Sequence, residues 1–230
     1  MALIIKAMGE ALRPGIRTDE LDEIGKKLLQ QYGARSAPKI TYDFPAYTCI
    51  SVNEEAAHGI PGERVIAAGD IVNIDVSAEK NCYFADSGYT FLVPPINPGH
   101  QRLCQKTQLA LTCAMAVARA DKPINLIGKH ITQVARKANY KTLKDLGSHG
   151  VGKSLHDEPE FIANYFDKKD RRILKEGQVI TIEPFLSTRA ELTYLARDGW
   201  TLLTPPGNRS AQFEHTMVIT RGEPIILTAA

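Results

Sequence analysis

Apolar residues recur every three or four positions in three segments of the chain, the spacing that gives an α-helix one buried face. The first segment opens at Thr18, a residue type that caps helix N-termini, and stops at Gly33, a residue type that often ends helices. We therefore predict amphipathic helices over residues 18–32, 98–120 and 125–139.

Short runs of β-prone apolar residues predict strands, two of them over residues 47–52 and 70–76. Three such runs contain an acidic residue: IVNIDVS holds Asp75, VITIEPF holds Glu183 and AQFEHTMVIT holds Glu214. An ionised carboxylate is costly to bury unless it is paired or coordinates a metal. These acids therefore need partners.

An internal repeat relates the two halves of the chain. AAGDIVNIDV aligns with KEGQVITIEP at a constant offset of 108 residues, so that Gly69 falls on Gly177 and Asp75 falls on Glu183. Helical sequence precedes each copy, and no low-complexity linker separates them. We therefore expect a duplicated α+β architecture in a single domain over residues 1–230.

A β-hairpin is expected between Asp75 and Asp86, because the turn signal Lys80-Asn81 lies between β-prone residues. If these two residues form the centre of the turn, Asp75 faces Asp86 directly. Opposed side chains are about 5 Å apart, where like charges repel. Two metal ions about 3.5–4 Å apart would turn that repulsion into attraction. The alternative interpretation is a solvent-facing pair of acids at the end of a hairpin.

Composition and charge exclude several classes of protein. With 43% hydrophobic and 23% charged residues, a chain of 230 residues can bury a sizeable core. The formal net charge of +2 produces no extended positive electrostatic potential that would attract nucleic acid. We therefore expect no specific nucleic acid partner. No stretch of about 18 consecutive apolar residues occurs, which excludes a membrane-spanning helix.

Cysteine usage and the first residues indicate the compartment. The four cysteines form no close CxxC pair, and the opening MALIIKAMGEAL lacks a signal-peptide cleavage pattern. Reduced thiols without a leader are typical of the cytoplasm. We therefore expect a cytoplasmic protein.

The side chains best suited to hold metal combine four carboxylates with one imidazole. No comparable number of cationic side chains lies in the same segments, so divalent ions are the cations that fit. Mostly oxygen ligands with one nitrogen suit Mn or Fe(II), with Co and Zn as alternatives, and the native metal stays open. We expect two divalent ions on Asp75, Asp86, His149, Glu183 and Glu214.

The remaining histidines divide by their surroundings. His58 in AAHGIPG and His156 in SLHDEP lie in loops, where a histidine is usually a surface residue. Beside a metal centre, both become candidates for hydrogen bonds to a substrate or a tetrahedral intermediate. His215 is expected on the opposite strand face from its neighbour Glu214.

Read in order, the motifs resemble one enzyme family. HGIPG, NIDV with Asp86 eleven residues beyond its aspartate, SHGVG with LHDEP, TIEPF and AQFEH follow the ordered signature of type I methionine aminopeptidases. The match runs from about Gly15 to Thr220 and fills all five ligand positions. The resemblance implies the pita-bread (creatinase/aminopeptidase) fold, with pseudo-twofold related halves and a central antiparallel sheet. It also implies a dimetal enzyme that removes the initiator methionine from nascent polypeptides when the second residue is small.

The resemblance also assigns roles to the ligands. Asp75 and Asp86 would chelate one metal, and His149 would bind the other. Glu214 would bridge the two ions together with Asp86. Glu183 would complete a metal shell and serve as the proton shuttle, so that a metal-bound water or hydroxide attacks the scissile carbonyl.

Further positions are implied to contact the substrate or a second kind of ion. His58 would lie near the leaving-group nitrogen, and His156 would steady the carbonyl oxygen. Asn53 and Ser210 resemble positions that bind a monovalent cation in some relatives. The methionine pocket would be lined by Phe44, Cys49, Leu155 and Trp200.

The chain departs from the family in three places. Its first strand and helix are expected to be short, Leu155 stands where a phenylalanine is familiar, and Phe44 stands where a tyrosine is familiar. The two substitutions affect the shape of the pocket more than the chemistry. The family resemblance further implies a monomer that associates transiently with the ribosome.

Two alternatives to an active methionine aminopeptidase stay open. A catalytically inactive relative would use the pita-bread fold as a binding protein; lost ligands would favour that interpretation, and none is lost. An X-Pro aminopeptidase or dipeptidase relative usually carries a separate N-terminal domain, for which 230 residues leave no room.

Overall fold

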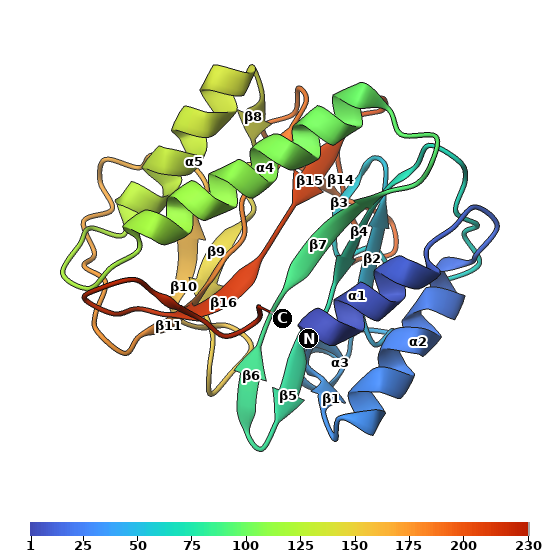
Figure 1. The fold of residues 1–230 in the computed structure, drawn as a ribbon, viewed down its shortest axis with the longest axis horizontal. Helices are drawn as coiled ribbons and strands as arrows, with labels where there is room; N and C mark the ends of the chain where they lie inside the picture. The colour runs from blue at the N-terminus through green and yellow to red at the C-terminus, as the bar shows by residue number, and fades with distance from the viewer. Residues whose placement is uncertain (230) are drawn as a thin grey trace.

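The computed structural model describes residues 1–229, in which two pairs of helices lie over a central sheet (Figure 1). The helices are α1 (Ala2–Ala11), α2 (Thr18–Gln31), α3 (Ala37–Tyr42), α4 (Pro98–Val117) and α5 (Asn125–Ala138). The strands of the central sheet are β2 (Cys49–Val52), β4 (Ile71–Asp75), β7 (Gly88–Leu92), β9 (Gly147–Gly150), β10 (Asp157–Ala163), β11 (Val179–Ile182), β16 (His215–Val218) and β17 (Ile225–Ile226). The smaller strands are β1 (Arg35–Ser36), β3 (Glu55–Ala57), β5 (Ala78–Lys80), β6 (Tyr83–Ala85), β8 (Lys141–Thr142), β12 (Phe185–Ser187), β13 (Tyr194–Leu195), β14 (Leu202–Leu203) and β15 (Ser210–Gln212).

Two antiparallel sheets meet at the middle of the molecule. One has the strand order β2-β4-β7, and the other has the order β10-β9-β11-β16-β17. At the seam between them, Tyr89 pairs with Phe213, and the Glu214 N–H donates to the Gly88 carbonyl at 2.9 Å. These contacts join the two sheets into one continuous antiparallel surface.

The internal repeat corresponds to two matching structural units. Gly69 and Gly177 adopt positive φ angles of 86° and 80° in the turns before β4 and β11. Their N–H groups donate to the carbonyls of Val93 and Ile219, at 3.1 and 2.9 Å, just beyond the partner strands β7 and β16. Each repeat thus builds a glycine turn, a central strand and its neighbour, which relates the halves as the sequence predicted.

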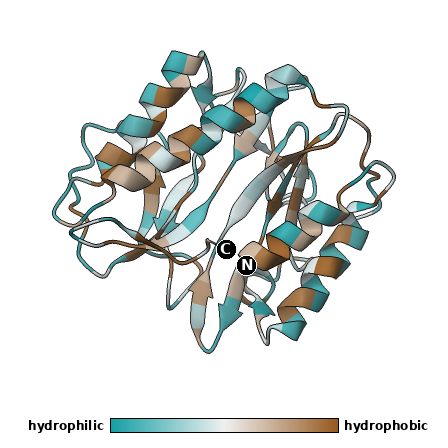
Figure 2. Ribbon diagram, viewed as in Figure 1, coloured by the Kyte–Doolittle hydropathy of each residue, from teal (hydrophilic) through white to brown (hydrophobic). Residues whose placement is uncertain are grey.

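A pair of helices covers each half of the sheet. Helices α1 and α2 pack on each other and on β2, β4 and β7, whereas α4 and α5 pack on each other and on β10, β11, β12 and β15. Figure 2 shows apolar and polar residues alternating along α4 and α5, as in amphipathic helices. The three predicted helices are confirmed, each ending one to three residues early. Within residues 1–229, no helix is long and apolar enough to cross a membrane.

The chain begins with helix α1, which has ten residues. Helix α1 packs against α2 and β4 and buries Ile4, Ile5 and Met8. Helix α2 begins at Thr18 as predicted, but its N-cap is Arg17, whose backbone N–H donates to the Glu20 carboxylate at 2.8 Å. The Thr18 hydroxyl instead donates to the Gly62 carbonyl at 3.1 Å, so Thr18 ties the helix to a loop.

The predicted hairpin forms with its turn displaced along the chain by one residue. The turn residues are Asn81 and Cys82, with φ angles of 54° and 66°. A two-residue hairpin turn of type I′ needs positive φ at both central positions, and this pair supplies it. Asp75 therefore pairs with Gly88, and the predicted direct opposition of Asp75 and Asp86 is wrong. Both acids nevertheless line the same cavity.

Candidate active site

The five predicted metal ligands converge from both halves of the central sheet. Asp75 ends β4, Glu183 directly follows β11, and Glu214 directly precedes β16. Asp86 follows β6, and His149 lies within β9. The sheet therefore assembles side chains that are far apart in the sequence.

The ligand atoms lie close together. Asp86, His149 and Glu214 each offer one atom, and these atoms all lie within 4.8 Å of one another. His149 Nε2 lies 3.5 Å from Glu183 Oε1. Asp75 lines the same cavity of about 250 Å³ as Asp86, His149 and Glu183. The structure thus brings all five residues together.

The carboxylates are buried with too few protein donors. Glu214 is 2% exposed and Asp86 is 7% exposed. The Ser77 hydroxyl donates to Asp86 Oδ1 at 2.7 Å, and the Gln212 amide donates to Glu214 Oε2 at 3.0 Å. Within residues 1–229, however, Asp75 Oδ1 and Glu214 Oε1 are buried without a hydrogen-bond partner. Over the same residues, no lysine or arginine forms a salt bridge with these acids.

Burial changes the acidity of this cluster. It raises the pKa of the Asp75, Glu183 and Glu214 carboxyls well above their usual range, and the negative charge of Asp86 raises each pKa further. A divalent cation would reverse the effect, because it stabilises ionised carboxylates. The excess of buried acids, the unpartnered oxygens and the single imidazole therefore fit a divalent metal centre.

His149 is held in one tautomer by the backbone. Its Nδ1 donates to the Gly150 carbonyl at 2.8 Å, and a carbonyl can only accept. Nε2 therefore keeps the lone pair that a metal ion requires. The His149 N–H donates to Thr181 Oγ1 at 3.1 Å, and the Glu183 N–H donates to Ser148 Oγ at 2.9 Å. Strands β9 and β11 thereby fix both ligands.

The loop histidines His58 and His156 border the same cavity. The His156 ring lies against the His149 ring, with centroids 4.1 Å apart and an interplanar angle of 38°, and its Nδ1 lies 2.6 Å from the Tyr42 hydroxyl. The protein around the cavity reduces hydration of this ring and, with a smaller contribution from His149, lowers the pKa of His156 to about 4. His156 is therefore neutral near pH 7 and can donate one hydrogen bond.

An apolar end of the cavity adjoins the acids. Phe44, Cys49, Leu155 and Trp200, the residues expected to line a methionine pocket, all border it. The rings of Phe44 and Trp200 meet edge to face, with centroids 5.2 Å apart and an interplanar angle of 87°. The cavity thus combines a polar, metal-binding end with an apolar one.

The two residues considered for a monovalent cation lie in different settings. Asn53 occupies the turn between β2 and β3, where its side chain donates to Asp70 at 2.8 Å and accepts from the Ile71 N–H at 3.2 Å. Ser210 lies in β15, paired with Ser187. The side-chain groups of Asn53 are therefore engaged by the protein itself.

Three residues that sequence reasoning did not single out support the site. They are the hydroxyl-bearing Tyr42 and Ser77 and the amide-bearing Gln212, whose contacts with the ligands and His156 are given above. Gln212 carried a sequence signal, because a residue two positions before Glu214 on an extended chain shares its face. Ser77 carried the same signal, because it lies two positions after Asp75. Tyr42 reaches the site through the tertiary fold, and local sequence gives no sign of it.

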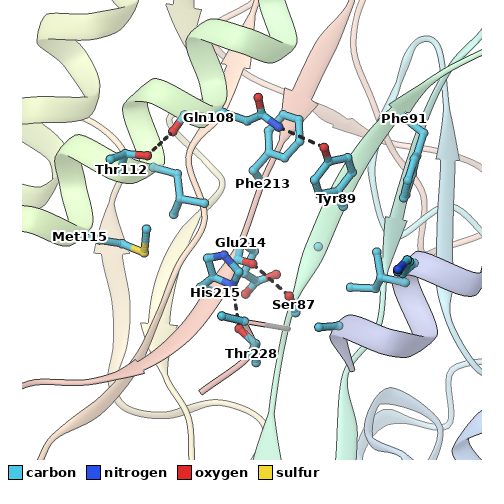
Figure 3. A pocket seen from close by; sticks show the side chains of 16 residues that line it. Ser87, Tyr89, Phe91, Gln108, Thr112, Met115, Phe213, Glu214, His215 and Thr228 are labelled. Carbon is cyan, nitrogen blue, oxygen red and sulfur yellow. Dashed lines mark hydrogen bonds between the residues drawn. The ribbon is translucent and has the colours of Figure 1, made fainter. Parts of the chain in front are cut away.

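A second cavity, of about 590 Å³, lies between α1, α4 and the strands β7 and β16 (Figure 3). Tyr89 and Phe213 form part of its wall, and their rings meet edge to face at 4.7 Å. His215 lines this cavity, where its Nδ1 lies 2.8 Å from the Thr228 hydroxyl. His215 thus turns away from the metal ligands, as its position beside Glu214 predicted.

Known proteins share both the sequence and the fold of this chain. Residues 1–221 match the profile of metallopeptidase family M24. A methionine aminopeptidase of Staphylococcus epidermidis is 46% identical over 228 residues, which cover 99% of this chain and 91% of the relative. The crystal structure of methionine aminopeptidase from Rickettsia prowazekii superposes with a TM-score of 0.94 at 33% identity, covering 99% of this chain and 92% of that chain. A prolidase from Pyrococcus furiosus gives a TM-score of 0.78 at 23% identity over 60% of its own length, which shows a shared fold alone.

These likenesses agree with the arrangement of ligands on the duplicated sheet. They confirm the predicted resemblance to methionine aminopeptidases, the predicted α+β pita-bread fold and the predicted class of enzyme, a metallopeptidase. The matched region includes every residue of the candidate active site. The chain belongs to metallopeptidase family M24.

Proposed function

We propose that this protein is a methionine aminopeptidase, a hydrolase that removes the initiator methionine from new polypeptides whose second residue is small. The observation that carries the proposal is the buried set of four carboxylates and one imidazole beside an apolar cavity. Relatives named methionine aminopeptidase support it over almost the whole chain.

Two divalent ions, drawn from Mn, Fe(II), Co and Zn, are the proposed cofactors. When bound, they would polarise the scissile carbonyl and lower the pKa of the attacking water. Asp75 and Asp86 would hold one ion and His149 the other, with Asp86 and Glu214 shared between them. The unpartnered oxygens of Asp75 and Glu214 and the lone pair on His149 Nε2 support this division.

Glu183 is proposed both as a metal ligand and as the proton shuttle. Its carboxyl group is buried, its Oε1 lies 3.5 Å from His149 Nε2, and burial raises its pKa. A carboxylate that borders the metal site lies within reach of the attacking water, where it can act first as a general base and then as a general acid. Glu183 would therefore take a proton from the attacking water and deliver it to the leaving amine.

His58 and His156 are proposed as catalytic residues that contact the substrate. Neutral His156 can donate a hydrogen bond to the carbonyl oxygen as negative charge develops there. His58, with a φ of 54°, sits in the loop after β3 and borders the cavity, where it would contact the leaving-group nitrogen. Neither residue is needed as a ligand, because five other side chains supply that role.

The substrate methionine is proposed to occupy the apolar end of the cavity. A thioether fills irregular apolar space and makes favourable contacts with the edges of aromatic rings. The edge-to-face pair of Phe44 and Trp200 offers such rings. The side chains proposed to contact methionine are Phe44, Cys49, Leu155 and Trp200.

The proposed substrate implies a setting for the enzyme. Nascent N-termini emerge from cytoplasmic ribosomes, so we propose a cytoplasmic location and transient association with the ribosome. Both halves of the chain supply ligands to one centre, which favours residues 1–230 acting as a single catalytic domain. We propose that this domain acts as a monomer. A monovalent cation near Asn53 and Ser210 stays a prediction.

Paired peptides and defined metals test the proposal. Metal-free protein is loaded with Mn, Fe(II), Co or Zn and assayed on Met-Ala-Ser, Lys-Ala-Ser and Ala-Pro-Ser, with metal content measured on the same samples. We expect two ions per chain and release of methionine from Met-Ala-Ser alone. Cleavage confined to Ala-Pro-Ser would indicate an X-Pro peptidase, and metal binding without any hydrolysis would indicate a binding protein. Full activity in metal-free protein would overturn the metal centre.

A further inference from the structure

Tyr42 places its hydroxyl at the rim of the active-site cavity, 2.6 Å from Nδ1 of His156. It is the last residue of α3, and its ring centroid lies 5.6 Å from that of His156. The next residue, Asp43, has a left-handed φ of 58° and ends the helix. Helix α3 and this turn thus deliver Tyr42 to the histidine and Phe44 to the apolar end of the cavity.

The adjacent rings of His149 and His156 need their single proton on different nitrogens. His149 donates from Nδ1 to the Gly150 carbonyl, so its Nε2 has a lone pair and can bind a metal ion. A histidine that steadies a substrate oxygen needs a proton on the nitrogen that faces the substrate. Because Nδ1 of His156 faces Tyr42, that proton must reside on Nε2.

The Tyr42 hydroxyl can keep the proton of His156 on Nε2. A phenol is a good donor and a poor acceptor, because its oxygen lone pair is delocalised into the ring. When the hydroxyl donates to Nδ1, the neutral imidazole carries its one proton on Nε2. The hydrogen bond made by one ring nitrogen therefore decides what the other nitrogen offers.

We propose that Tyr42 is a positioning residue that holds His156 as the Nε2–H tautomer. The proposal rests on the function of His156 proposed above and adds the group that selects its tautomer. It also explains why two histidine rings 4.1 Å apart have different roles. The backbone makes His149 a ligand, whereas Tyr42 makes His156 a donor that offers no lone pair to the metals.

Tyr42→Phe tests the proposal, with Tyr32→Phe as the matched control. Tyr32 is 42% exposed against 43% for Tyr42, and within residues 1–229 its hydroxyl forms no hydrogen bond. We expect Tyr42→Phe to lower kcat roughly three- to tenfold, the effect of one neutral hydrogen bond. KM for Met-Ala-Ser and the metal content should stay near those of the unmodified enzyme, and Tyr32→Phe should match that enzyme throughout.

Nitrogen NMR gives a direct reading of the tautomer. In the zinc-loaded enzyme labelled with ¹⁵N-histidine, His156 should show one protonated Nε2 and one unprotonated Nδ1, with the signals assigned by their loss in His156→Ala. Tyr42→Phe should shift these signals toward a mixture of tautomers. Unchanged nitrogen signals together with unmodified kcat in Tyr42→Phe would overturn the proposal, and so would loss of metal in that variant.

A double variant separates this proposal from the one on which it rests. Because Tyr42 acts through the histidine ring, adding Tyr42→Phe to His156→Ala should lower kcat no further. A further loss of roughly three- to tenfold in that background would overturn the positioning role. A defective His156→Ala beside a normal Tyr42→Phe overturns the positioning role alone. A fully active His156→Ala overturns both the catalytic role of His156 and the inference built on it.

Discussion

Two buried acidic sites in this protein are completed in different ways. Asp22 on α2 is 8% exposed, and its carboxylate accepts hydrogen bonds from the N–H and the hydroxyl of Thr48, each at 2.8 Å. It also accepts from the Tyr47 N–H at 3.2 Å. At the candidate active site, Asp75 Oδ1 and Glu214 Oε1 are buried too, but within residues 1–229 they receive no donor.

Burial by itself therefore does not separate a structural acid from a functional one. Burial raises the pKa of Asp22 as it raises those of Asp75 and Glu214, but hydrogen bonds from Thr48 and Tyr47 oppose the rise at Asp22. Tyr47 and Thr48 directly precede β2 in the chain, so Asp22 ties α2 to the sheet. Buried acids that lack such donors are available to a cation.

The largest difference between the two sites should appear when one aspartate in each is replaced by asparagine. Asp86→Asn removes charge from a proposed bridging ligand, and we expect kcat/KM to fall roughly 10²–10⁴-fold, because breaking a buried ionic interaction costs about 3–5 kcal/mol. Metal content should fall below two ions per chain. Asp22→Asn is the matched control and should keep both ions. Full metal content and full rate in Asp86→Asn would contradict the assignment.

His156→Ala should affect turnover without affecting the metals. Removing a donor aimed at a developing oxyanion typically lowers kcat by about 10²–10³-fold. We expect that loss with both ions retained and KM changed far less. His58→Ala should behave similarly, with a larger share of its defect in KM. Metal analysis and turnover measured on the same preparations check both variants, and release of an ion from either would make that residue a ligand.

Asp22→Ala should show the opposite profile, a loss of stability without a loss of chemistry. It leaves the Thr48 and Tyr47 donors buried and unpaired, so the free energy of unfolding should fall by about 1–3 kcal/mol. Urea unfolding of the metal-loaded enzyme measures this, and the rate per folded molecule should be unchanged. A metal or rate defect in folded Asp22→Ala would mean that the two acidic sites are coupled.

Trp200→Ala should weaken substrate binding more than it disturbs the metals. The variant removes one partner of the edge-to-face pair with Phe44. Loss of one large apolar contact surface should raise KM for Met-Ala-Ser roughly tenfold. Leu195→Ala is the control, because Leu195 is 59% exposed in β13 and does not line the cavity. Equal changes in the two variants would argue against Trp200 as a pocket residue.

The most gradual effect should be the pH dependence of the metal-free protein. Because burial raises the pKa of Asp75, Glu183 and Glu214, the folded state binds more protons than the unfolded chain above the ordinary carboxyl pKa. The contribution of these three acids to stability should therefore be largest in acid and fall as pH rises toward the raised values, by up to about 1.4 kcal/mol per pH unit for each proton. Bound metal should remove this slope. Urea unfolding across the pH range measures it, and a metal-free protein that gains stability as pH rises would contradict the cause.

Features encoded by local pattern were predictable from the sequence, and features that depend on tertiary contacts were not. Helical spacing located α4 and α5, and the repeated glycine-to-acid step located β4 and β11. The hairpin turn was placed one residue early, because the register depends on Cys82 adopting a positive φ that its residue type does not signal. Helix α1 depends on packing against α2, which the periodicity of its own short segment does not reveal.

The candidate active site divides in the same way. Acids in apolar runs signalled the ligands, because their burial has a cost that the sequence alone makes visible. The residue that orients His156 left no such signal. Tyr42 contacts a histidine 114 positions away, and its 43% exposure is that of an ordinary surface tyrosine.

The seam between the two repeats also bears on how the chain folds. Asp86 comes from the first half of the chain and Glu214 from the second. The Tyr89–Phe213 bridge and the Glu214–Gly88 hydrogen bond join the two sheets at the same place. An ion held by both acids would close a loop of about 130 residues. A covalent link of that span lowers the conformational entropy of the unfolded chain, which corresponds to about 5 kcal/mol of free energy. All four cysteines are free. The metal would thus act as a reversible cross-link that stabilises the folded state across this seam.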